Sequence, residues 1–551
     1  MEIEPKNRES ENILGDHEHT SDFSPTPNKI LTFNGKDGNS EAARRPGATL
    51  DREMTKIRGN SLFVIIVSSI MMSFACAELM VFASPFLELV PPIMCLTDSE
   101  WHACEKEQAC TPGVQYALVD DDKYSLKNWV QDLDIVCSPE WKIGMIGSAI
   151  FVGMFVGALV LSPVSDIYGR RPVHIIGVVV SLIGSIWIYF FPNWTSVLTS
   201  LFFKGVGMYT RLSISYLYTL EMFDEERCKP VATIIMSINN SLSSLMALYF
   251  IFGGRDATFF LLSSIFILGY SLIFIPLLPE SPKFLFSLKK YNATRSTLIR
   301  IAEINGVKYE KLPFQEELEL HGLAGFKAEE HLQVIEEKDG ESKSFLELFT
   351  NFKLFTNMCV TIFVYMFNVF SMYMISFMVK YLPGDKYWNL FFIGLADFIP
   401  SVLSGVLMAL LPTKKAMILT HGFICIAVAI SFITNYYDND GIVDPAYTGE
   451  NFDMSNFVSN NIAYISMAVI FLIRFAITLE SCLNFYIVYE LFPANFASVV
   501  YGGCNILAGL VSIFSPMAVE IFDNPLILVF VMACICTFLC TILIEGTKTL
   551  T

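Results

Sequence analysis

The chain has 551 residues, of which 53% are hydrophobic and only 17% are charged, whereas roughly 25% of an ordinary soluble protein is charged. One soluble core could not bury so much apolar surface, so the composition excludes soluble, disordered, collagen-like and small disulfide-scaffold classes. The net charge of −17 gives no general basis for binding nucleic acid. The composition therefore indicates a polytopic membrane protein.

Apolar stretches of about 20 residues predict where the chain crosses roughly 30 Å of hydrocarbon. None of these stretches alternates with a period of two, which favours helices over an outer-membrane barrel. We therefore predict an all-α membrane protein with twelve transmembrane helices. They are expected at residues 60–84, 143–163, 172–191, 195–219, 231–252, 258–278, 353–379, 388–411, 415–435, 461–489, 497–522 and 524–544.

Hydrophilic segments divide these helices into two groups of six. The polar first segment shows no apolar period and no signal peptide, so we expect a disordered tail there. The predicted order is a cytoplasmic tail at 1–59, a six-helix half at 60–278 with a large loop at 88–141, a linker with amphipathic helices at 279–352, a second six-helix half at 353–545, and a short cytoplasmic tail at 546–551.

The distribution of charge predicts the orientation of the chain. Loop 88–141 has eleven acidic residues against three lysines, and loop 436–460 has five acidic residues and no basic one. Basic residues follow the other ends of the spans, and the positive-inside rule then places both termini in the cytoplasm, most simply at the plasma membrane. These basic residues are Arg170, Arg171, Arg227, Lys229, Lys414 and Lys415.

Four of the thirteen cysteines lie together in loop 88–141, at Cys95, Cys104, Cys110 and Cys137. An even cluster in a loop that faces an oxidising compartment indicates two disulfides. Three pairings of four cysteines are possible, and the sequence does not choose among them. The other nine cysteines lie in or beside the spans, where packing is their expected role.

The segment Leu161–Pro172 follows the second span and has the pattern of a tight hairpin with paired charges. Gly169 permits the turn, and Asp166 at a helix end can accept hydrogen bonds from an arginine. Arg170 and Arg171 can pair with acidic residues on a neighbouring helix. Such contacts close one face of a transporter and must break when that face opens.

This hairpin resembles the loop signature of the major facilitator superfamily, with Ser162 in place of the usual glycine and Ile167 in place of the usual arginine. The cysteine-bearing loop and the segment Pro279–Phe286 narrow the resemblance to the organic cation/anion transporter family, and Tyr489–Pro493 agrees with it. The resemblance covers about residues 60–545. It implies two six-helix halves that rock around a solute bound near the middle of the membrane.

The resemblance also implies a set of residues that gate the cytoplasmic face, drawn from the hairpin, from the fourth and tenth spans and from the linker. This predicted gate comprises Asp166, Gly169, Arg170, Arg171, Glu221, Arg227, Glu280 and Glu490.

Several positions depart from the family pattern, mainly in the second half. The second hairpin is reduced to Pro412–Lys415, without an acid or a glycine. Ala497 replaces an expected arginine, and the closing motif has become Ile544–Lys548. In the fourth span an arginine is replaced by Leu201, with Lys204 one turn later. These losses allow either a transporter with altered gating or a protein that no longer transports.

Among the ionisable residues within predicted spans, where a charge costs on the order of 2.5–3.5 kcal/mol, five are candidates for a functional or pairing role. They are Glu78, Arg211, Asp397, Arg474 and Glu480. Arg474 and Glu480 are six residues apart and face different sides of one helix, so we do not pair them. Asp397, Arg474 and Glu480 are predicted in the cavity or gate, or in structural pairs. Glu78 could attract a cation, carry a proton or pair with Arg211.

Three further positions complete the predicted substrate cavity. Thr478 shares a helix face with Arg474. Tyr373, in an aromatic stripe of the seventh span, lies where the family places a pocket tyrosine, and an aromatic face suits organic cations. Gly509 occupies the position where the family's cation carriers place aspartate and its anion carriers place arginine. Cationic or zwitterionic solutes are slightly favoured.

No phosphate-binding loop, metal-ligand spacing or catalytic triad is identifiable, so we expect no enzyme, cofactor or metal. His174 and His421 stand near span starts and are expected at the membrane interface. The predicted partners are a small organic solute and the lipid bilayer. The sequence thus predicts a facilitated uniporter or exchanger of organic ions. A proton-coupled sugar-type carrier and a non-transporting receptor or scaffold are the alternatives.

Overall fold

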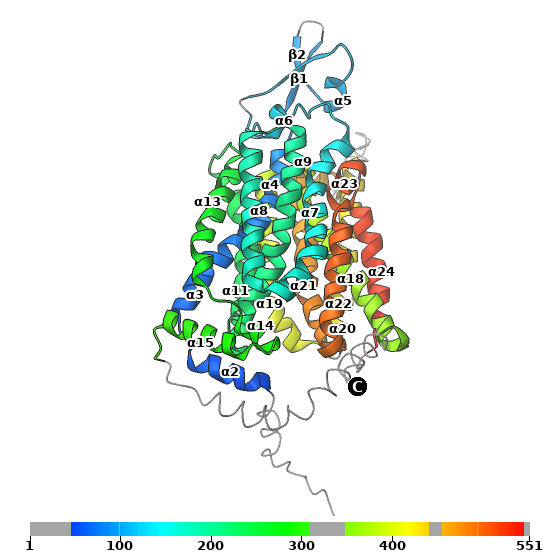
Figure 1. Ribbon diagram of the computed structural model, residues 1–551. Helices are drawn as coiled ribbons and strands as arrows, with labels where there is room; N and C mark the ends of the chain where they lie inside the picture. The colour runs from blue at the N-terminus through cyan, green and yellow to red at the C-terminus, as the bar shows by residue number, and fades with distance from the viewer. Residues whose placement is uncertain are drawn as a thin grey trace, which may run out of the picture. The chain divides into compact units, whose positions relative to one another are not determined.

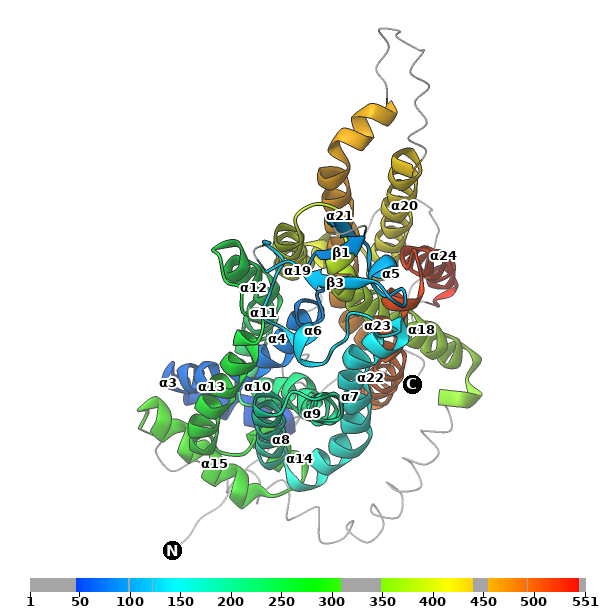
Figure 2. The same cartoon turned by 90° about the horizontal axis from the view of Figure 1, so that it is seen from above.

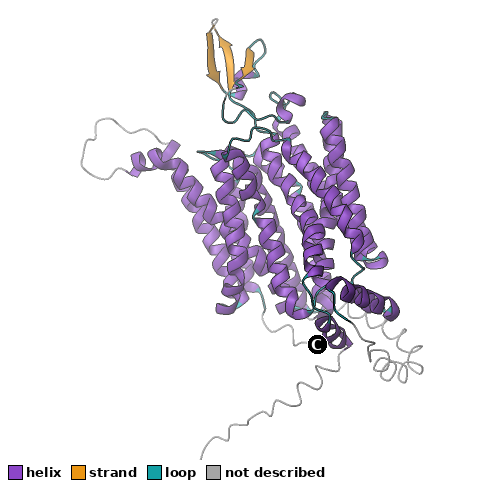
Figure 3. Cartoon of the chain, turned by 90° about the vertical axis from the view of Figure 1, so that its left-hand side faces the viewer, coloured by secondary structure: helices purple, strands orange, loops and turns teal. Residues whose placement is uncertain are grey.

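The structure is a computed structural model that describes residues 46–97, 100–120, 122–308, 348–439, 454–492 and 494–544. The chain divides after Leu50 into an N-terminal segment and a body that begins at Asp51. Helices make up most of the body, and among the described residues strands occur only in one small sheet (Figure 3).

Six helical segments form the first half, and four of them consist of two or three shorter helices in line. Two of the six contain a π-helical turn, η1 and η2, a feature that is uncommon and often functional. In chain order the segments are α3 (Ser61–Ile66), η1 (Val67–Met71) and α4 (Met72–Leu87); α7 (Glu140–Tyr168); α8 (Arg170–Phe190); α9 (Trp194–Tyr209), η2 (Thr210–Ile214) and α10 (Ser215–Glu221); α11 (Glu225–Asn240) and α12 (Leu242–Ile251); and α13 (Phe259–Phe274) with η3 (Ile275–Leu277).

Six more segments form the second half. Viewed along the bundle, α8 of the first half and α20 of the second lie on opposite sides of it (Figure 2). The segments are α18 (Phe352–Met378) with η5 (Val379–Tyr381); α19 (Lys386–Leu410); α20 (Thr413–Asn439); α21 (Met454–Leu491); α22 (Ala494–Ser512) with α23 (Phe514–Ile521); and α24 (Leu526–Ile542).

Ten helices in the described part of the chain are long and apolar enough to cross a membrane. The other two predicted spans correspond to α24, whose apolar helix has 17 residues, and to the segment from α9 to α10, which contains Lys204 and Arg211. The structure therefore supports a polytopic helical membrane protein, and the count of twelve spans stays a prediction.

The loop after α4 folds into a small antiparallel sheet that the sequence did not predict. Strand β1 (Ile93–Thr97) lies between β2 (Glu100–Cys104) and β3 (Gln115–Leu118), with Ile93 opposite both Cys104 and Leu118. Two short helices complete the loop, α5 (Lys106–Ala109) and α6 (Trp129–Asp132). We call the end of the bundle that carries this sheet the sheet end (Figure 1).

The two predicted disulfides are present, and the structure selects one of the three pairings. Cys95 is bonded to Cys104 within the sheet, and Cys110 is bonded to Cys137. The loop is also anchored by Asn128, whose side-chain amide donates to the backbone oxygens of Phe86 and Leu89 at the end of α4, over 3.0 and 2.8 Å. The part of the loop that contains α6 is thereby fixed to the end of α4.

The described start of the linker lies at the opposite end of the bundle, which we call the linker end (Figure 1). It comprises α14 (Pro282–Ser287) and α15 (Tyr291–Asn305), in the segment where we predict amphipathic helices. Residues 309–347 lie outside the described residues, and the amphipathic linker stays a prediction.

The predicted disordered tail at 1–59 is wrong at its end, because α2 (Pro46–Lys56) is helical. Met54 in the last turn of α2 and Ile57 directly after the helix are buried, and this burial of apolar side chains favours an ordered segment here. Residues 1–45 and the predicted tail at 546–551 lie outside the described part.

Candidate functional site

A buried ion pair joins α19 to α21 inside the second half. Arg474 Nε lies 2.6 Å from Asp397 Oδ1, and Arg474 Nη2 lies 2.9 Å from Asp397 Oδ2. The Thr478 hydroxyl donates to Asp397 Oδ1 over 2.6 Å. Both charged side chains are fully buried. The predicted shared face of Arg474 and Thr478 is thus confirmed, and the pair keeps a charge in apolar surroundings without leaving it uncompensated.

Glu480 points to a different neighbour, as the six-residue spacing predicts. It accepts a hydrogen bond from the Thr420 hydroxyl, and its Oε2 lies 3.6 Å from His421 Nδ1, which also contacts the Met417 carbonyl at 2.8 Å. The prediction that the two histidines lie at the membrane interface is wrong, because His174 and His421 are both fully buried. The reason is that α8 and α20 pack inside the bundle at these positions, and each imidazole has a polar contact there.

Tyr373 and Gly509 both face α7 of the first half. The Tyr373 ring lies 4.6 Å from the ring of Phe151, centroid to centroid, and a side chain on Gly509 would meet Phe155 at 3.8 Å. Phe151 and Phe155 are four residues apart on one face of α7. These two predicted cavity residues therefore lie where the halves meet, separate from the Asp397–Arg474 pair.

The first hairpin forms the network that its sequence predicts. Gly169 has a φ of +112°, which favours glycine, and a side chain there would lie 2.5 Å from Glu280. Arg170 contacts Asp166 and lies 3.6 Å from Glu221, while its backbone N–H donates to Glu280 Oε1 over 3.0 Å. Burial raises the pKa of the Glu221 carboxyl above its ordinary value. The partners that we describe belong to the first half and, in the case of Glu280, to the start of the linker.

Arg171 reaches the end of the sixth segment, and the second half has a matching contact. Arg171 Nη2 donates to the carbonyl oxygen of Pro276 over 2.8 Å. In the second half, Lys414 Nζ donates to the carbonyl oxygen of Leu543 over 2.5 Å. The reduced second hairpin has therefore kept a basic contact from hairpin to last helix, although it lacks the acid and the glycine. The sequence does not indicate this contact, because its acceptor is a backbone atom.

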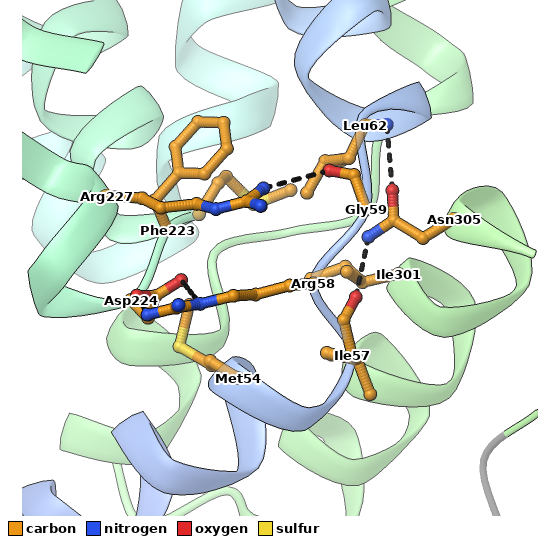
Figure 4. Close-up of a pocket in the computed structure, with 11 residues that line it drawn as sticks. Met54, Ile57, Arg58, Gly59, Leu62, Phe223, Asp224, Arg227, Ile301 and Asn305 are labelled. Atoms are coloured by element: carbon orange, nitrogen blue, oxygen red, sulfur yellow. Dashed lines mark hydrogen bonds and ion pairs between the residues drawn. The ribbon is translucent and has the colours of Figure 1, made fainter. Parts of the chain in front are cut away.

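Arg227 lines a pocket at the linker end rather than joining the hairpin (Figure 4). Its guanidinium donates to the carbonyl oxygen of Gly59 over 3.2 Å. Beside it, Arg58 binds Asp224 through both carboxylate oxygens. Burial raises the pKa of the Asp224 carboxyl, but the hydrogen bonds from Arg58 more than offset this and leave that pKa below its ordinary value.

Asn305 of α15 completes this pocket by bridging the turn between α2 and α3. Its amide donates to the Ile57 carbonyl over 2.8 Å and accepts from the Leu62 backbone N–H over 3.0 Å (Figure 4). None of the predicted cavity residues lines the pocket. The side chains of Glu78 and Glu490, predicted in the cavity and the gate, lie outside the description, although both residues are helical. Their roles stay predictions.

Comparisons with known proteins agree with this architecture. The family model of the Major Facilitator Superfamily matches residues 138–516. Solute carrier family 22 member 4 of Mus musculus is 22% identical over 56% of this chain and 53% of its own length. Organic cation transporter 1 of Caenorhabditis elegans is 23% identical over 52% of this chain and 47% of its own. The chain thus spans about half the length of each of these relatives.

The fold is similar to that of the xylose transporter XylE from E. coli, solved in a partially occluded inward-open conformation. The TM-score is 0.56 at 11% sequence identity, and the match covers 88% of this chain and 99% of that one. At this identity the likeness concerns the fold alone. The chain belongs to the Major Facilitator Superfamily, a family of membrane transporters rather than enzymes, and the organic cation transporters are its distant homologues.

Proposed function

We propose that this protein carries small organic solutes, with cations and zwitterions preferred over anions, by alternating access as a uniporter or exchanger. The way in which the halves meet supports this mechanism. Near the sheet end, the Ser148 hydroxyl of the first half donates to the Ile513 carbonyl of the second over 2.7 Å. A side chain on Gly147 would lie 2.7 Å from both Phe377 and Pro516, so the halves are closely packed there.

The linker end is arranged differently, which is what alternating access requires. The contacts that we describe for Arg171 and Lys414 run from each hairpin to the last helix of its own half. Each hairpin is thereby braced within its own half at this end, while close packing at the sheet end holds the two halves together. Such an arrangement suits rocking of one half against the other.

The preference for cations and zwitterions rests on the charges inside the second half. The Asp397 carboxylate accepts hydrogen bonds from two nitrogens of the Arg474 guanidinium, so Arg474 has little uncompensated charge to attract an anionic solute. Gly509 adds no charge. The adjoining Tyr373 and Phe151 rings provide an aromatic face of the kind that attracts organic cations. The name of one distant relative, an organic cation transporter, points the same way.

The proposed orientation places the sheet end outside the plasma membrane and both termini in the cytoplasm. The two disulfides favour an oxidising compartment for the sheet. Arg171 and Lys414, at the linker end, follow the distribution of basic residues that is typical of cytoplasmic loops.

The test is uptake by cells that express the full-length chain, with labelled small cations, anions and zwitterions, at normal and at depolarised membrane potential. We expect saturable uptake of cations or zwitterions, and for a net cation uptake that falls on depolarisation. Labelling of surface protein on the same cells establishes that the chain is exposed there. Surface expression without uptake of any class would overturn the proposal and favour the receptor or scaffold function.

A matched pair of variants tests the aromatic face. Tyr373→Leu removes a ring at the contact between the halves, and we expect uptake of an organic cation at low concentration to fall roughly 2- to 30-fold, the range of one cation–π contact. Phe355→Leu removes a ring from the same helix at a position that is 39% exposed, and it should leave uptake unchanged. Equal effects of the two variants would contradict a pocket role for Tyr373.

A further inference from the structure

Three charged side chains that no sequence motif indicates meet at the sheet end. Glu88 caps the C-terminal end of α4, Lys380 lies in η5, and Glu520 lies in the last turn of α23. Lys380 Nζ lies 2.7 Å from Glu520 Oε1 and 3.2 Å from Glu88 Oε2. The Tyr381 hydroxyl donates to Glu520 Oε2 over 2.8 Å. We call Glu88, Lys380 and Glu520 the sheet-end cluster.

The cluster is buried and its charges do not balance. Each of the three side chains is no more than 3% exposed. With both acids ionised, the cluster would hold two negative charges against one positive charge. Glu520 has partners on both oxygens, whereas Glu88 Oε1 has no hydrogen-bond partner among the described residues. An unpartnered buried carboxylate oxygen is costly, and a proton on Glu88 would remove the excess charge.

The cluster also joins the two halves. Glu88 belongs to the first half, whereas Lys380 and Glu520 belong to two different segments of the second. If the halves separate at the sheet end, as the proposed function requires, these contacts must break and Glu88 must become exposed to water. We propose that Glu88 is a proton-binding site, and that its protonation favours the closed sheet end over the open one. This inference rests on alternating access.

The direction of the effect follows from proton linkage. Burial raises the pKa of Glu88 in the closed arrangement to about 7, an increase that Lys380 opposes and Glu520 reinforces. An exposed glutamate has a pKa of about 4.3. The closed form therefore binds the proton more tightly, so the stabilisation of closure is complete below about pH 4.3 and is lost as the pH rises through about 7. Between about pH 8 and pH 6 the closed-to-open ratio should rise roughly tenfold.

Other charged groups stand near the cluster without contacting Glu88 in the contacts that we describe. Lys386 of α19 lies within electrostatic reach of Lys380 and of Asp122 in the loop. Lys123 and Asp385 form an ion pair of their own at this end. The groups that act directly on Glu88 are Lys380 and Glu520, so variants at Glu88 and Glu520 address the proposed site.

The experiment measures opening directly, without a transported solute. Spin labels are placed at Glu140→Cys and Asp523→Cys, exposed positions on the two halves at the sheet end, in full-length protein in lipid nanodiscs. The exposed cysteines Cys359 and Cys534 are replaced by serine. Electron–electron distances are measured at about pH 8 and at about pH 6. The ratio of the short-distance population to the long-distance population should be roughly tenfold higher at about pH 6. A distribution that does not change with pH would overturn the proposal.

Two variants and a control test whether Glu88 is the residue that binds the proton. Glu88→Gln mimics the protonated side chain, so the short distance should dominate at both pH values. Glu107→Gln changes an exposed acid in the same loop and should keep the wild-type response. A wild-type response in Glu88→Gln would overturn the proposal. If Glu88→Gln does not fold, Glu520→Gln provides the test. Because Glu520 raises the pKa of Glu88, its removal should shift the pH at which the distance changes to a lower value. A distance change at the wild-type pH would overturn the proposal.

The result is separable from the proposed function. A pH-dependent distance in a protein that takes up no solute would support the proton site and contradict transport. Uptake together with a distance that is insensitive to pH would support transport and overturn the proton site.

Discussion

At the scale of single residues, the buried arginine of α21 shows how this chain tolerates a charge among apolar helices. Arg474 is fully buried, and a carboxylate on the neighbouring helix meets two of its nitrogens. The gain from such a pair is small, because both groups lose their hydration, but the loss of one partner leaves the other charge uncompensated. The cost of breaking the pair should therefore exceed its net contribution to stability.

Asp397→Ala tests this asymmetry. Removal of the carboxylate leaves Arg474 as an uncompensated buried charge, and we expect a loss of about 3–5 kcal/mol of stability. The melting temperature of the detergent-purified protein, followed by size-exclusion chromatography after heating, reports the loss. The double variant Asp397→Leu with Arg474→Met removes both charges and should recover most of the melting temperature.

An exposed pair of the same chemistry provides the control. Asp166 contacts Arg170 at the linker end, but the Asp166 side chain is 62% exposed. Asp166→Ala should therefore change stability by less than about 1 kcal/mol. If Asp397→Ala and Asp166→Ala melted alike, the buried pair would not stabilise the second half.

The sequence predicts which of these residues need a partner but not which partner they have. Arg474 and Thr478 are four apart, so their common face follows from helix geometry alone. Asp397 is 77 residues from Arg474, and the contact depends on how α19 packs against α21. The sheet-end cluster was missed for the same reason: Glu88 stands among the acidic residues of a loop, and its partners lie far along the chain.

At the scale of helices, two glycines set the distance between α7 and α9. A side chain on Gly153 would lie 2.0 Å from the backbone oxygen of Phe202, and one on Gly205 would lie 2.0 Å from that of Ile150. Backbone atoms cannot move aside as side chains do, so the two helices must separate to admit even a methyl group. Close approach at small residues is a common way for membrane helices to pack.

Gly153→Ala should therefore destabilise the first half by about 1–3 kcal/mol, the usual cost of overpacking a closely packed interface. The readout is the yield of monodisperse protein together with its melting temperature.

Gly269→Ala is the matched control, because Gly269 lies in α13 and has nothing within 4 Å of an added side chain. Alanine is the better helix former, so this variant should be neutral or more stable by up to about 1 kcal/mol. Similar losses in both variants would contradict the packing argument.

The predicted spans agree with the helices because long apolar runs are the clearest signal in the sequence. The elements that the sequence missed lack such a signal. Strand β1 (Ile93–Thr97) is five residues long, and its loop is rich in polar residues and cysteines without clear alternation. The π-turn η2 (Thr210–Ile214) depends on tertiary packing, and no composition marks it in advance.

At the scale of the whole molecule, each half has the same kind of contact between its hairpin and its last helical segment. This holds although the hairpin of the second half has lost most of the family motif. Arg171 binds the carbonyl oxygen of Pro276 at the end of the sixth segment, and Lys414 binds that of Leu543 after the twelfth. A basic side chain that reaches a backbone oxygen needs neither the acid nor the glycine of the full motif. The second hairpin can therefore lose most of its signature and still hold its half together, so this loss does not by itself argue against transport.

The closed sheet end allows a direct test of alternating access. A side chain on Gly144 would lie 3.1 Å from the Cα atom of Met517 in the other half. Disulfides join residues whose Cα atoms are about 4.4–6.8 Å apart, so Gly144→Cys with Met517→Cys should cross-link the halves on oxidation. Uptake of the solute identified by screening should stop in the oxidised protein and return on reduction, because the sheet end must open in every cycle.

The native cysteines provide a cross-link that should have no such effect. Cys425 and Cys534 have sulfur atoms 3.4 Å apart, and both belong to the second half. Oxidation of this pair ties α20 to α24 without joining the halves, so uptake should continue in the protein without added cysteines. The double-cysteine variant is therefore made with Cys534→Ser, so that one cross-link is scored at a time. Undiminished uptake after complete cross-linking of Gly144→Cys to Met517→Cys would mean that solute crosses without separation of the halves at the sheet end, and rocking of the two halves would have to be abandoned as the mechanism.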